Sequence, residues 1–501
     1  MQAPEGNKME FVSTRGQNKK VSAAYAIKCG LAEDGGLYMP ETIPALTFDE
    51  LKELAERSYV ERAAYVIGKF LTDYTYTELL EDASNAYAEE KFGESPAPVK
   101  KINECLYSLE LWHGPTCAFK DMALQIMPHL FVRALRKTGE KRNALILVAT
   151  SGDTGKAALE GYRDVPGTKI QVFYPTDGVS TMQKLQMQTQ EGGNVSVLGI
   201  RGNFDDAQSG VKRMFADKEL AQKLDESGYF FSSANSINWG RLVPQIVYYV
   251  SAYLDMVASG DIALGEAIDV CVPTGNFGNI FAAYIAKRMG LPICKLVCAS
   301  NVNNVLTDFL SCGTYDRNRD FCPTISPSMD ILISSNLERL LYTVAGADAT
   351  RDYMAKLSGD GKYTVSDDVM QKINESFIGF YTDENMTKET IKHFFADQNY
   401  LADTHTAVAL SAATRYMSTC EAERKMLVVS TASPYKFAKD VYASLVGITD
   451  VADTDAPDAL SELTKTVIPK PLADLKNKKL RHPDTIGKDG MDDAVTSFIG
   501  A

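Results

Sequence analysis

Short apolar runs alternate with longer amphipathic stretches between about residues 144 and 300. The apolar runs have the length of strands and are rich in β-branched residues. They are ALILVAT (144–150), KIQVFYP (169–175), NVSVLGI (194–200), AIDVCVP (267–273) and CKLVCAS (294–300). The stretches between them have helical periodicity. Because wholly apolar strands that alternate with helices are typical of covered parallel sheets, we predict an α/β fold with helices on both faces.

The two ends of the chain have different patterns. Residues 1–98 contain charged, helix-periodic stretches and end at the proline-rich ESPAPVKK, which indicates a small, mainly helical N-terminal domain. A chain of 501 residues is expected to form two or three domains. We therefore predict a catalytic α/β region of two subdomains over 99–455 and a polar C-terminal tail over 456–501. Residues 312–361 are irregular and indicate an insertion or crossover.

Composition narrows the possible partners and compartment. The formal net charge of −13 disfavours binding to nucleic acid or to an anionic membrane, since both need clustered basic surface. We expect no signal peptide and no membrane span, because no suitable apolar run occurs. Nine scattered cysteines favour reduced thiols in a cytoplasmic protein, with a zinc site at Cys294 and Cys298 as a remote alternative. We predict no metal site, since the five histidines show no HExxH spacing.

The segment LELWHGPTCAFKDMALQ (109–125) places Lys120 just inside a predicted helix. The positive end of the helix dipole disfavours protonation of a lysine there. A lysine with a depressed pKa can attack an aldehyde and later act as a base. On local sequence alone, a lysine that merely extends from a surface helix is the more common case.

Two glycine-containing loops follow predicted strands. In ATSGDTGKAA, the residues Ser151 and Thr154 can donate to an anion and Asp153 can accept, although a simple capping turn explains the loop equally well. In VPTGNFGN, a phosphate at the helix start would meet successive N–H groups. That second loop contains Gly275, Asn276, Phe277, Gly278 and Asn279. A site that binds two anions would explain both loops.

Two polar clusters complete the candidate chemistry. The segment SSANSINWGR contains Asn235, Ser236, Asn238 and Arg241 directly before an apolar helix. Helix capping accounts for Ser236 or Asn238 but leaves Arg241 unexplained. In STASPYKFA, Thr431 follows a strand and can face a ligand or cap the next helix.

Together these segments resemble the threonine synthase family, whose members are pyridoxal-phosphate (PLP) enzymes of the tryptophan-synthase-β fold type (fold type II). The resemblance covers nearly the whole chain. It includes FVSTRG, GLAEDGGLYMPE, HGPTCAFKD, ATSGDTGKAA, SANSIN, VPTGNFGN, ADTHTAVA and STASPYKFA. The order of HGPT-x-AFKD, SGDTG and GNFG is far more specific than any one of these motifs.

The resemblance implies roles for the candidate residues. Lys120 would form the internal aldimine, Gly275–Gly278 would bind the cofactor phosphate, and Thr431 would hydrogen-bond the pyridine nitrogen. Asp153 would also belong to the cofactor site, and Asn279 stands where relatives often have Asp. The substrate phosphate would be held by Ser151, Thr154, Asn235 and Arg241, of which Arg241 offers a charged, bidentate partner.

The implied reaction converts O-phospho-L-homoserine and water into L-threonine and phosphate, with Lys120 as the base. A serine or threonine dehydratase, or a phospholyase of threonine-synthase-like type, would share the lysine and the cofactor loop. A non-catalytic protein that kept the fold is a further alternative. The oligomeric state (monomer or homodimer), any effector, and whether Arg15 reaches the active site are left open by the sequence.

Overall fold

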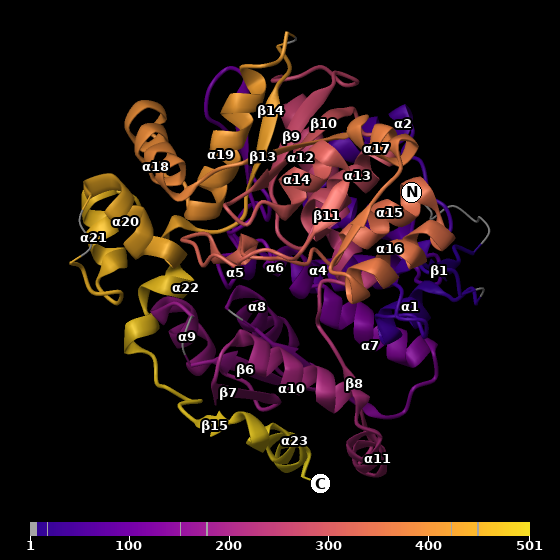
Figure 1. Ribbon diagram of the computed structural model, residues 1–501. Helices are drawn as coiled ribbons and strands as arrows, with labels where there is room; N and C mark the ends of the chain where they lie inside the picture. The colour runs from indigo at the N-terminus through magenta and orange to yellow at the C-terminus, as the bar shows by residue number, and fades with distance from the viewer. Residues whose placement is uncertain are drawn as a thin grey trace.

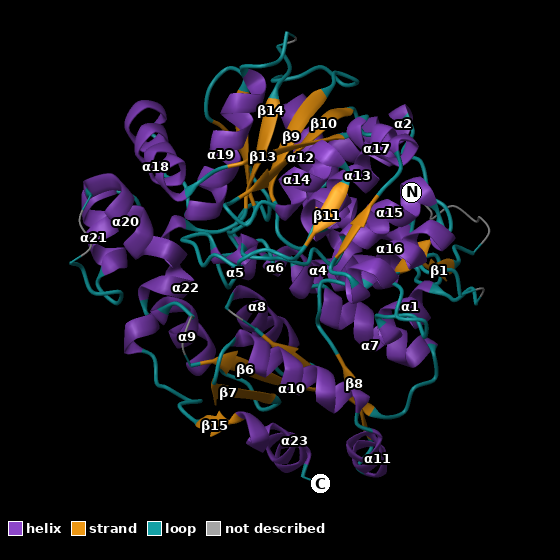
Figure 2. Cartoon of the chain, viewed as in Figure 1, coloured by secondary structure: helices purple, strands orange, loops and turns teal. Residues whose placement is uncertain are grey.

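The computed structural model describes residues 8–17, 19–150, 152–176, 179–421, 423–447 and 450–500. Two separate, mainly parallel sheets form its framework, one above the other in Figure 2. Helices pack against both sheets, so the predicted α/β fold is confirmed. All five predicted strands between residues 144 and 300 are present, with ends that differ by a residue or two.

The first sheet has six strands in the order β13-β10-β9-β14-β4-β3. Their bounds are β3 (Val99–Lys101), β4 (Leu106–Glu110), β9 (Ile268–Pro273), β10 (Ile293–Ser300), β13 (Phe377–Tyr381) and β14 (Met426–Ser430). All neighbours are parallel except β3 and β4. The adjacent strands β9, β14 and β4 therefore end at the same edge.

The second sheet has five parallel strands in the order β15-β7-β6-β5-β8. Their bounds are β5 (Asn143–Ala149), β6 (Thr168–Pro175), β7 (Val195–Arg201), β8 (Tyr229–Ser232) and β15 (Thr485–Gly487). Around this sheet lie α8 (Asp153–Tyr162), α9 (Thr181–Gln188), α10 (Phe204–Ala216) and α11 (Lys218–Glu226). The strands β5 and β8 are neighbours, so the loops after them meet.

The helix α12 (Trp239–Ala258) runs through the core, and almost every one of its side chains is buried. A helix that is apolar all round is expected in such a position. It packs against α3 (Tyr59–Gly68), α6 (Asp121–Leu124) and α13 (Gly278–Arg288). The other helices of this part are α7 (Met127–Lys137), α14 (Val305–Cys312), α17 (Asp367–Asn374), α18 (Glu384–Gln398), α19 (Thr404–Met417) and α20 (Ala438–Val446). Among the described residues, no helix is both long enough and apolar enough to cross a bilayer.

The N-terminal region is mainly helical, as predicted. Its elements are β1 (Phe11–Ser13), α1 (Ala23–Cys29), β2 (Tyr38–Pro40), α2 (Phe48–Ala55), α3, α4 (Tyr76–Ala86) and α5 (Glu89–Phe92). Capping boxes at Thr47, Ser58 and Thr75 begin α2, α3 and α4. Its apolar side chains join the hydrophobic cluster that contains α12, so this region shares its core with the α/β part. The boundary at residue 98 stays a prediction.

Residues 312–361, which were expected to be irregular, contain α15 (Leu337–Ala345), α16 (Ala347–Gly359) and the strand β11 (Thr314–Asp316). The strand β11 pairs antiparallel with β12 (Lys362–Thr364). The two strands escape a periodicity analysis because each has only three residues.

The C-terminal segment, which we expected to be a polar tail, folds back onto the molecule. It forms α21 (Ala456–Thr464), α22 (Lys470–Ala473), β15 and α23 (Met491–Ile499). The strand β15 extends the second sheet beside β7, and α23 buries Met491 and Val495 against it. Three buried apolar residues at helical spacing in α23 are a weak signal inside a polar stretch.

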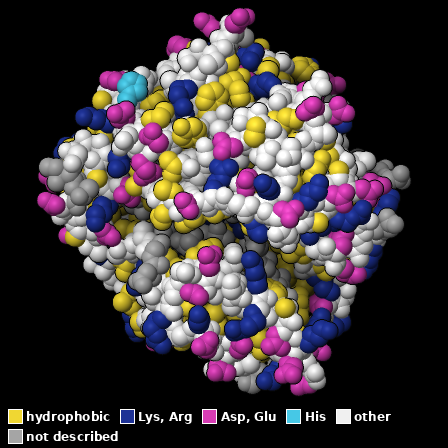
Figure 3. Space-filling view, viewed as in Figure 1, with side chains coloured by type: hydrophobic (Ala, Val, Ile, Leu, Met, Phe, Trp, Pro, Cys, Tyr) yellow, Lys and Arg dark blue, Asp and Glu magenta, His cyan; other side chains and the backbone are white. Residues whose placement is uncertain are grey.

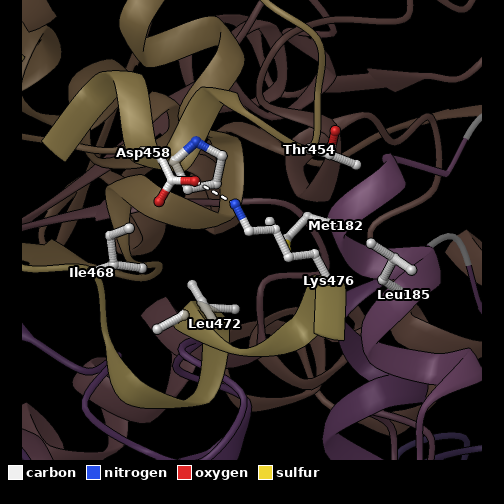
Figure 4. A pocket seen from close by; sticks show the side chains of 9 residues that line it. Met182, Leu185, Thr454, Asp458, Ile468, Leu472 and Lys476 are labelled. Carbon is white, nitrogen blue, oxygen red and sulfur yellow. Dashed lines mark hydrogen bonds and ion pairs between the residues drawn. The ribbon is translucent and has the colours of Figure 1, made fainter. Parts of the chain in front are cut away.

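The helices α21 and α22 close against α9. Between them lies a cavity of only about 20 Å³, lined by Met182, Leu185, Ile468 and Leu472 (Figure 4). Lys476 and Asp458 form an ion pair at its side, with 2.5 Å between Nζ and Oδ2. Such a space holds about one water molecule, so we interpret it as a packing gap and not as a ligand site.

Candidate active site

All five sequence motifs follow the carboxyl ends of strands. The loops after β4, β14 and β9 lie at one edge of the first sheet, and those after β5 and β8 lie at one edge of the second. From the side shown in Figure 1, the surface is hollowed between the parts that cover the two sheets (Figure 3). Ligands of α/β proteins bind at such carboxyl ends. The topology therefore brings the motifs into two facing groups.

Lys120 is held beside Thr431 by backbone pairing. The N–H of Phe119 donates to the carbonyl of Thr431 at 2.8 Å, and Ala118 forms an antiparallel bridge with Ala432. Lys120 itself is the N-cap of the short helix α6. The two segments are 311 positions apart in the chain, and their pairing fixes the lysine next to the predicted pyridine-nitrogen partner.

The turn before Lys120 is fixed by Asp121, which is fully buried. Its carboxylate accepts hydrogen bonds from the N–H of Thr116 at 2.8 Å and from the Thr116 hydroxyl at 2.7 Å. A Cβ at Gly114 would lie 2.6 Å from a carboxylate oxygen of Asp121, so only glycine allows this approach. The residues of the HGPT turn thus have mainly a positioning role.

The pKa of Lys120 is lowered to about 8, as the sequence led us to expect. Burial is the largest cause, the nearby cations Arg241 and Lys436 contribute, and Asp153 opposes the shift. The helix dipole that we first considered is at most a small contribution, because α6 has only four residues. Desolvation is therefore what makes this lysine a nucleophile near neutral pH.

Asp153 begins α8 and forms an ion pair with Lys436, with 2.8 Å between Oδ1 and Nζ. Gln183 also donates to this oxygen at 2.8 Å. Burial alone would raise the pKa of Asp153, but Lys436 and Lys120 hold it well below its usual range. The carboxylate therefore stays charged, and it connects the loop after β5 with the segment that follows β14.

Lys436 is a residue that the sequence analysis missed. It is 2% exposed, and its ammonium group also donates to the carbonyl of Thr116 at 2.9 Å. It stands in the STASPYKFA motif, but a lysine near a helix start is usually a surface residue. Its role at the site comes from the ion pair with Asp153, which joins the segment after β14 of the first sheet to the loop after β5 of the second sheet.

The loop after β9 has the geometry of an anion cradle. The carbonyl of Gly275 accepts from the Ser334 hydroxyl at 2.7 Å, and that of Asn276 accepts from the Asn336 side chain at 3.0 Å. Phe277 has a φ of +62° and is the N-cap of α13. With the carbonyls turned toward the protein, the N–H groups of the first turn of α13 are left without intrahelical acceptors. This arrangement fits a phosphate.

Asn279 supplies a further observation in favour of an anion here. Its Oδ1 accepts hydrogen bonds from the hydroxyls of Tyr248 and Tyr249, both at 2.5 Å. Its Nδ2 is buried and has no hydrogen-bond partner among the residues that the structure describes. A buried amide donor without a partner is costly unless a ligand accepts from it. The residues at this loop therefore fit the phosphate of the cofactor.

A second buried donor belongs to Arg241, in the first turn of α12. Its Nη1 donates to the carbonyl of Ala234 at 2.8 Å, while its Nε has no partner within the described part of the chain. Burial lowers its pKa to about 10, and no described carboxylate pairs with it. A buried guanidinium without a counter-ion fits an anionic ligand.

The remaining predicted residues are less informative. Thr154 is half-buried in the first turn of α8, Thr431 is buried and Asn235 is exposed. Ser151 lies outside the described residues. The capping alternative applies to Asn238, whose Oδ1 accepts from the N–H of Gly240 at 2.8 Å at the start of α12.

His405 and Asp403, in the ADTHTAVA motif, were also missed as functional residues. Asp403 accepts from His405 Nδ1 at 2.9 Å, and Nε2 of this histidine accepts from the N–H of Ser328 at 3.1 Å. A Cβ at Gly275 would lie 2.7 Å from the Ser328 carbonyl oxygen. The histidine thus supports the segment directly behind the phosphate loop.

Arg15 does not lie free near the site but forms a bidentate pair with Glu338. Both nitrogen–oxygen distances are 2.9 Å, and Thr14 donates to the same carboxylate at 2.6 Å. Glu338 is in the first turn of α15, which follows the Asn336 that holds the phosphate loop. The N-terminal segment therefore braces the loop from outside.

Replacement of Arg15 by glutamine is expected to lower the free energy of unfolding by about 2 kcal/mol, because it leaves the buried carboxylate of Glu338 without its charged partner. Chemical denaturation monitored by circular dichroism measures the change. Lys19→Gln is the control, since its pair with Glu33 is exposed and should contribute little. Equal stabilities for the two variants would contradict the bracing role.

The lowered pKa of Lys120 predicts how fast cofactor-free protein captures PLP at different pH values. Because the neutral amine is the reactive form, the capture rate should rise with pH and level off above about 8. An unperturbed lysine would still be gaining reactivity at pH 10. Stopped-flow absorbance of the refilled protein measures the profile. A rate that keeps rising to pH 10 would contradict the desolvated environment.

Comparison with known proteins identifies the class and then the family. The family model "Pyridoxal-phosphate dependent enzyme" matches residues 92–432, so the chain is a PLP enzyme, and the predicted cofactor is confirmed. The models "Threonine synthase N terminus" and "Threonine synthase, C-terminal" match residues 10–87 and 406–487.

Individual relatives agree with these matches. A threonine synthase of Pseudomonas aeruginosa is 36% identical, and the match covers 93% of this chain and 97% of the relative. The PLP-bound crystal structure of a threonine synthase from Brucella melitensis has a TM-score of 0.87 and 36% identity, over 98% of this chain and 100% of that one. The chain belongs to the threonine synthase family, as its motifs led us to expect.

Another relative is human "Threonine synthase-like 1", which is 41% identical over 87% of this chain. The chain spans only 60% of the length of that protein.

Proposed function

We propose that this protein converts O-phospho-L-homoserine and water into L-threonine and phosphate, with PLP as the cofactor. The observation that carries the proposal is the pair of unpartnered buried donors, Asn279 Nδ2 and Arg241 Nε. One belongs to the loop that fits the cofactor phosphate. The other belongs to the first turn of α12, after the loop that follows β8. A substrate with its own phosphate matches this arrangement.

The cofactor would be held at three points. Gly275–Gly278 and Asn279 would bind its phosphate, Lys120 would be its covalent attachment, and the Thr431 hydroxyl would meet its ring nitrogen. Asp153 would complete this side of the site. Bound PLP supplies an electron-withdrawing ring that makes protons near the substrate amino group removable.

The substrate would be positioned by the loops of the second sheet. Arg241 would hold its phosphate with a charged, bidentate hydrogen bond, and Thr154, Asn235 and Ser151 would complete the pocket. Lys120, with a pKa of about 8, can take up a proton and return it near neutral pH. A neutral hydroxyl at Thr431 would leave the ring nitrogen unprotonated.

The proposal is tested by measuring both products from O-phospho-L-homoserine with the purified, PLP-loaded protein. Equal amounts of phosphate and threonine are expected, and protein stripped of cofactor is the control. Absence of turnover in the loaded protein would overturn the proposal. Serine and threonine should be poor substrates, because they leave Arg241 without an anion; rapid dehydration of either would favour a dehydratase.

A second candidate is a lyase that releases phosphate without forming threonine. It would use the same Lys120 and the same loop after β9, so these residues alone do not separate it from a threonine synthase. In the same assay, phosphate together with a 2-oxo acid and ammonia would identify it. A protein that binds PLP but acts on none of these compounds would match the non-catalytic alternative.

For the compartment, we propose the cytoplasm. The support is that all nine cysteines, each within the described residues, are free thiols. Fractionation of cells that produce the full-length protein tests this.

A further inference from the structure

A cleft of about 590 Å³ lies outside the set of residues that form the proposed active site. It is bordered by α4, α7 and the end of α8, and Pro115 and Gln125 line it. None of the residues proposed to bind cofactor or substrate lines it. Glu160, at its border, is seven residues after Asp153 on α8, so the two sites are about 10 Å apart along that helix.

The acidic groups of the cleft already have partners. Arg133 donates to Asp82 at 2.8 Å and to Glu81 at 2.6 Å. Glu160 accepts from Lys156 at 2.9 Å, and Asp164 accepts from a backbone N–H at 2.7 Å. These carboxylates therefore need no cation from a ligand.

Three donors of the cleft have no anionic partner. Arg136 and Lys91 line the cleft and form no ion pair with any residue in the described ranges, although Lys91 donates to the carbonyl of Asn85 at 3.0 Å. Gln125 is 2% exposed, and its Nε2 has no hydrogen-bond partner in the described structure. His129 is neutral at pH 7, because burial lowers its pKa to about 4. The charges in the cleft that have no counter-ion among the described residues are therefore the positive charges of Arg136 and Lys91.

We propose that this cleft is a second ligand site, which binds a small organic anion through its carboxylate or phosphate groups. Gln125 and Arg136 would donate to the anion, and Lys91 would add a positive charge. The volume lies in the range of small-molecule sites. The site is independent of the reaction, because it shares no ligand-binding residue with the proposed active site.

The test is calorimetric titration of the PLP-loaded, full-length protein with citrate and, separately, with inorganic phosphate. The double variant Arg136→Gln, Lys91→Gln should bind the preferred probe at least about tenfold more weakly, since two charged donors are lost. Arg351→Gln removes one charge on α16, outside the cleft, and should bind like the original protein. Preference for citrate or for phosphate tells which anionic group the site takes.

Phosphate can also bind at Arg241, so its titration is repeated in an Arg241→Gln background. The cleft site should persist there and should disappear only when Arg136 and Lys91 are also replaced. Equal affinities in the cleft variant and the original protein would overturn the proposal, and so would failure of both probes to bind. Circular dichroism and PLP content confirm that each variant is folded.

Discussion

Lys120→Ala is expected to lower turnover of O-phospho-L-homoserine by at least about ten-thousandfold, because the variant loses the covalent attachment of the cofactor and the base together. It should also lose the visible absorbance that bound PLP acquires when it is linked to the protein. Phosphate release and the absorbance spectrum of the same sample measure both effects. The fold should be retained, since the side chain makes no described hydrogen bond that other residues depend on.

The variant Lys436→Met tests whether Lys120, and not the second buried lysine of the site, is the residue that binds PLP covalently. Lys436 is as buried as its partner Asp153, but it is not the proposed attachment point. This variant should still show the spectrum of linked PLP, whereas Lys120→Ala should not. If Lys120→Ala kept the spectrum and Lys436→Met lost it, the assignment of the two lysines would be wrong.

The parallel sheets could be predicted because their strands are continuous apolar runs with helices between them. Such runs are a local signal, and β5, β6, β7, β9 and β10 were each found from it. The strand β15 was not, because its three residues TIG carry almost no pattern of their own. Its place is determined by pairing with β7, which is distant in sequence, and by α23.

For the candidate site, too, local motifs could be recognised from the sequence, but contacts between distant segments could not. Lys120 and the GNFG loop were recognised from local motifs, and the structure places both at one edge of the first sheet. Lys436 was missed, because its meaning comes from Asp153, which is 283 positions earlier in the chain. The sequence left open whether Arg15 reaches the active site. In the structure Arg15 contacts Glu338, which is 323 positions away in the chain.

The cause of the lowered Lys120 pKa was also beyond local sequence. A helix start can be recognised from residue types, but desolvation depends on everything that packs around the amine. Here Arg241 and Lys436, from two other segments, add to the effect of burial. The direction could therefore be predicted, and its main cause could not.

Arg241→Gln should have opposite effects on activity and stability. For activity, loss of the charged donor should reduce kcat/KM for O-phospho-L-homoserine by about a hundredfold to a thousandfold, which corresponds to about 3–4 kcal/mol. Most of the loss should fall on the step that releases phosphate, because the anion gains charge there. Steady-state kinetics with phosphate detection measure it.

For stability, the same replacement removes a buried cation that no described carboxylate neutralises. Unpaired buried charge is destabilising, so the ligand-free variant should unfold at a higher denaturant concentration than the original protein. Gln245→Ala, which removes a neighbouring hydrogen bond to the Arg241 carbonyl, is the matched control and should be destabilised instead. If Arg241→Gln lost both activity and stability, Arg241 would be a structural residue whose partner lies within the protein. If it lost activity and gained stability, the arginine would be a binding residue for the substrate anion. Its buried charge would then destabilise the ligand-free protein, and the bound anion would offset this destabilisation.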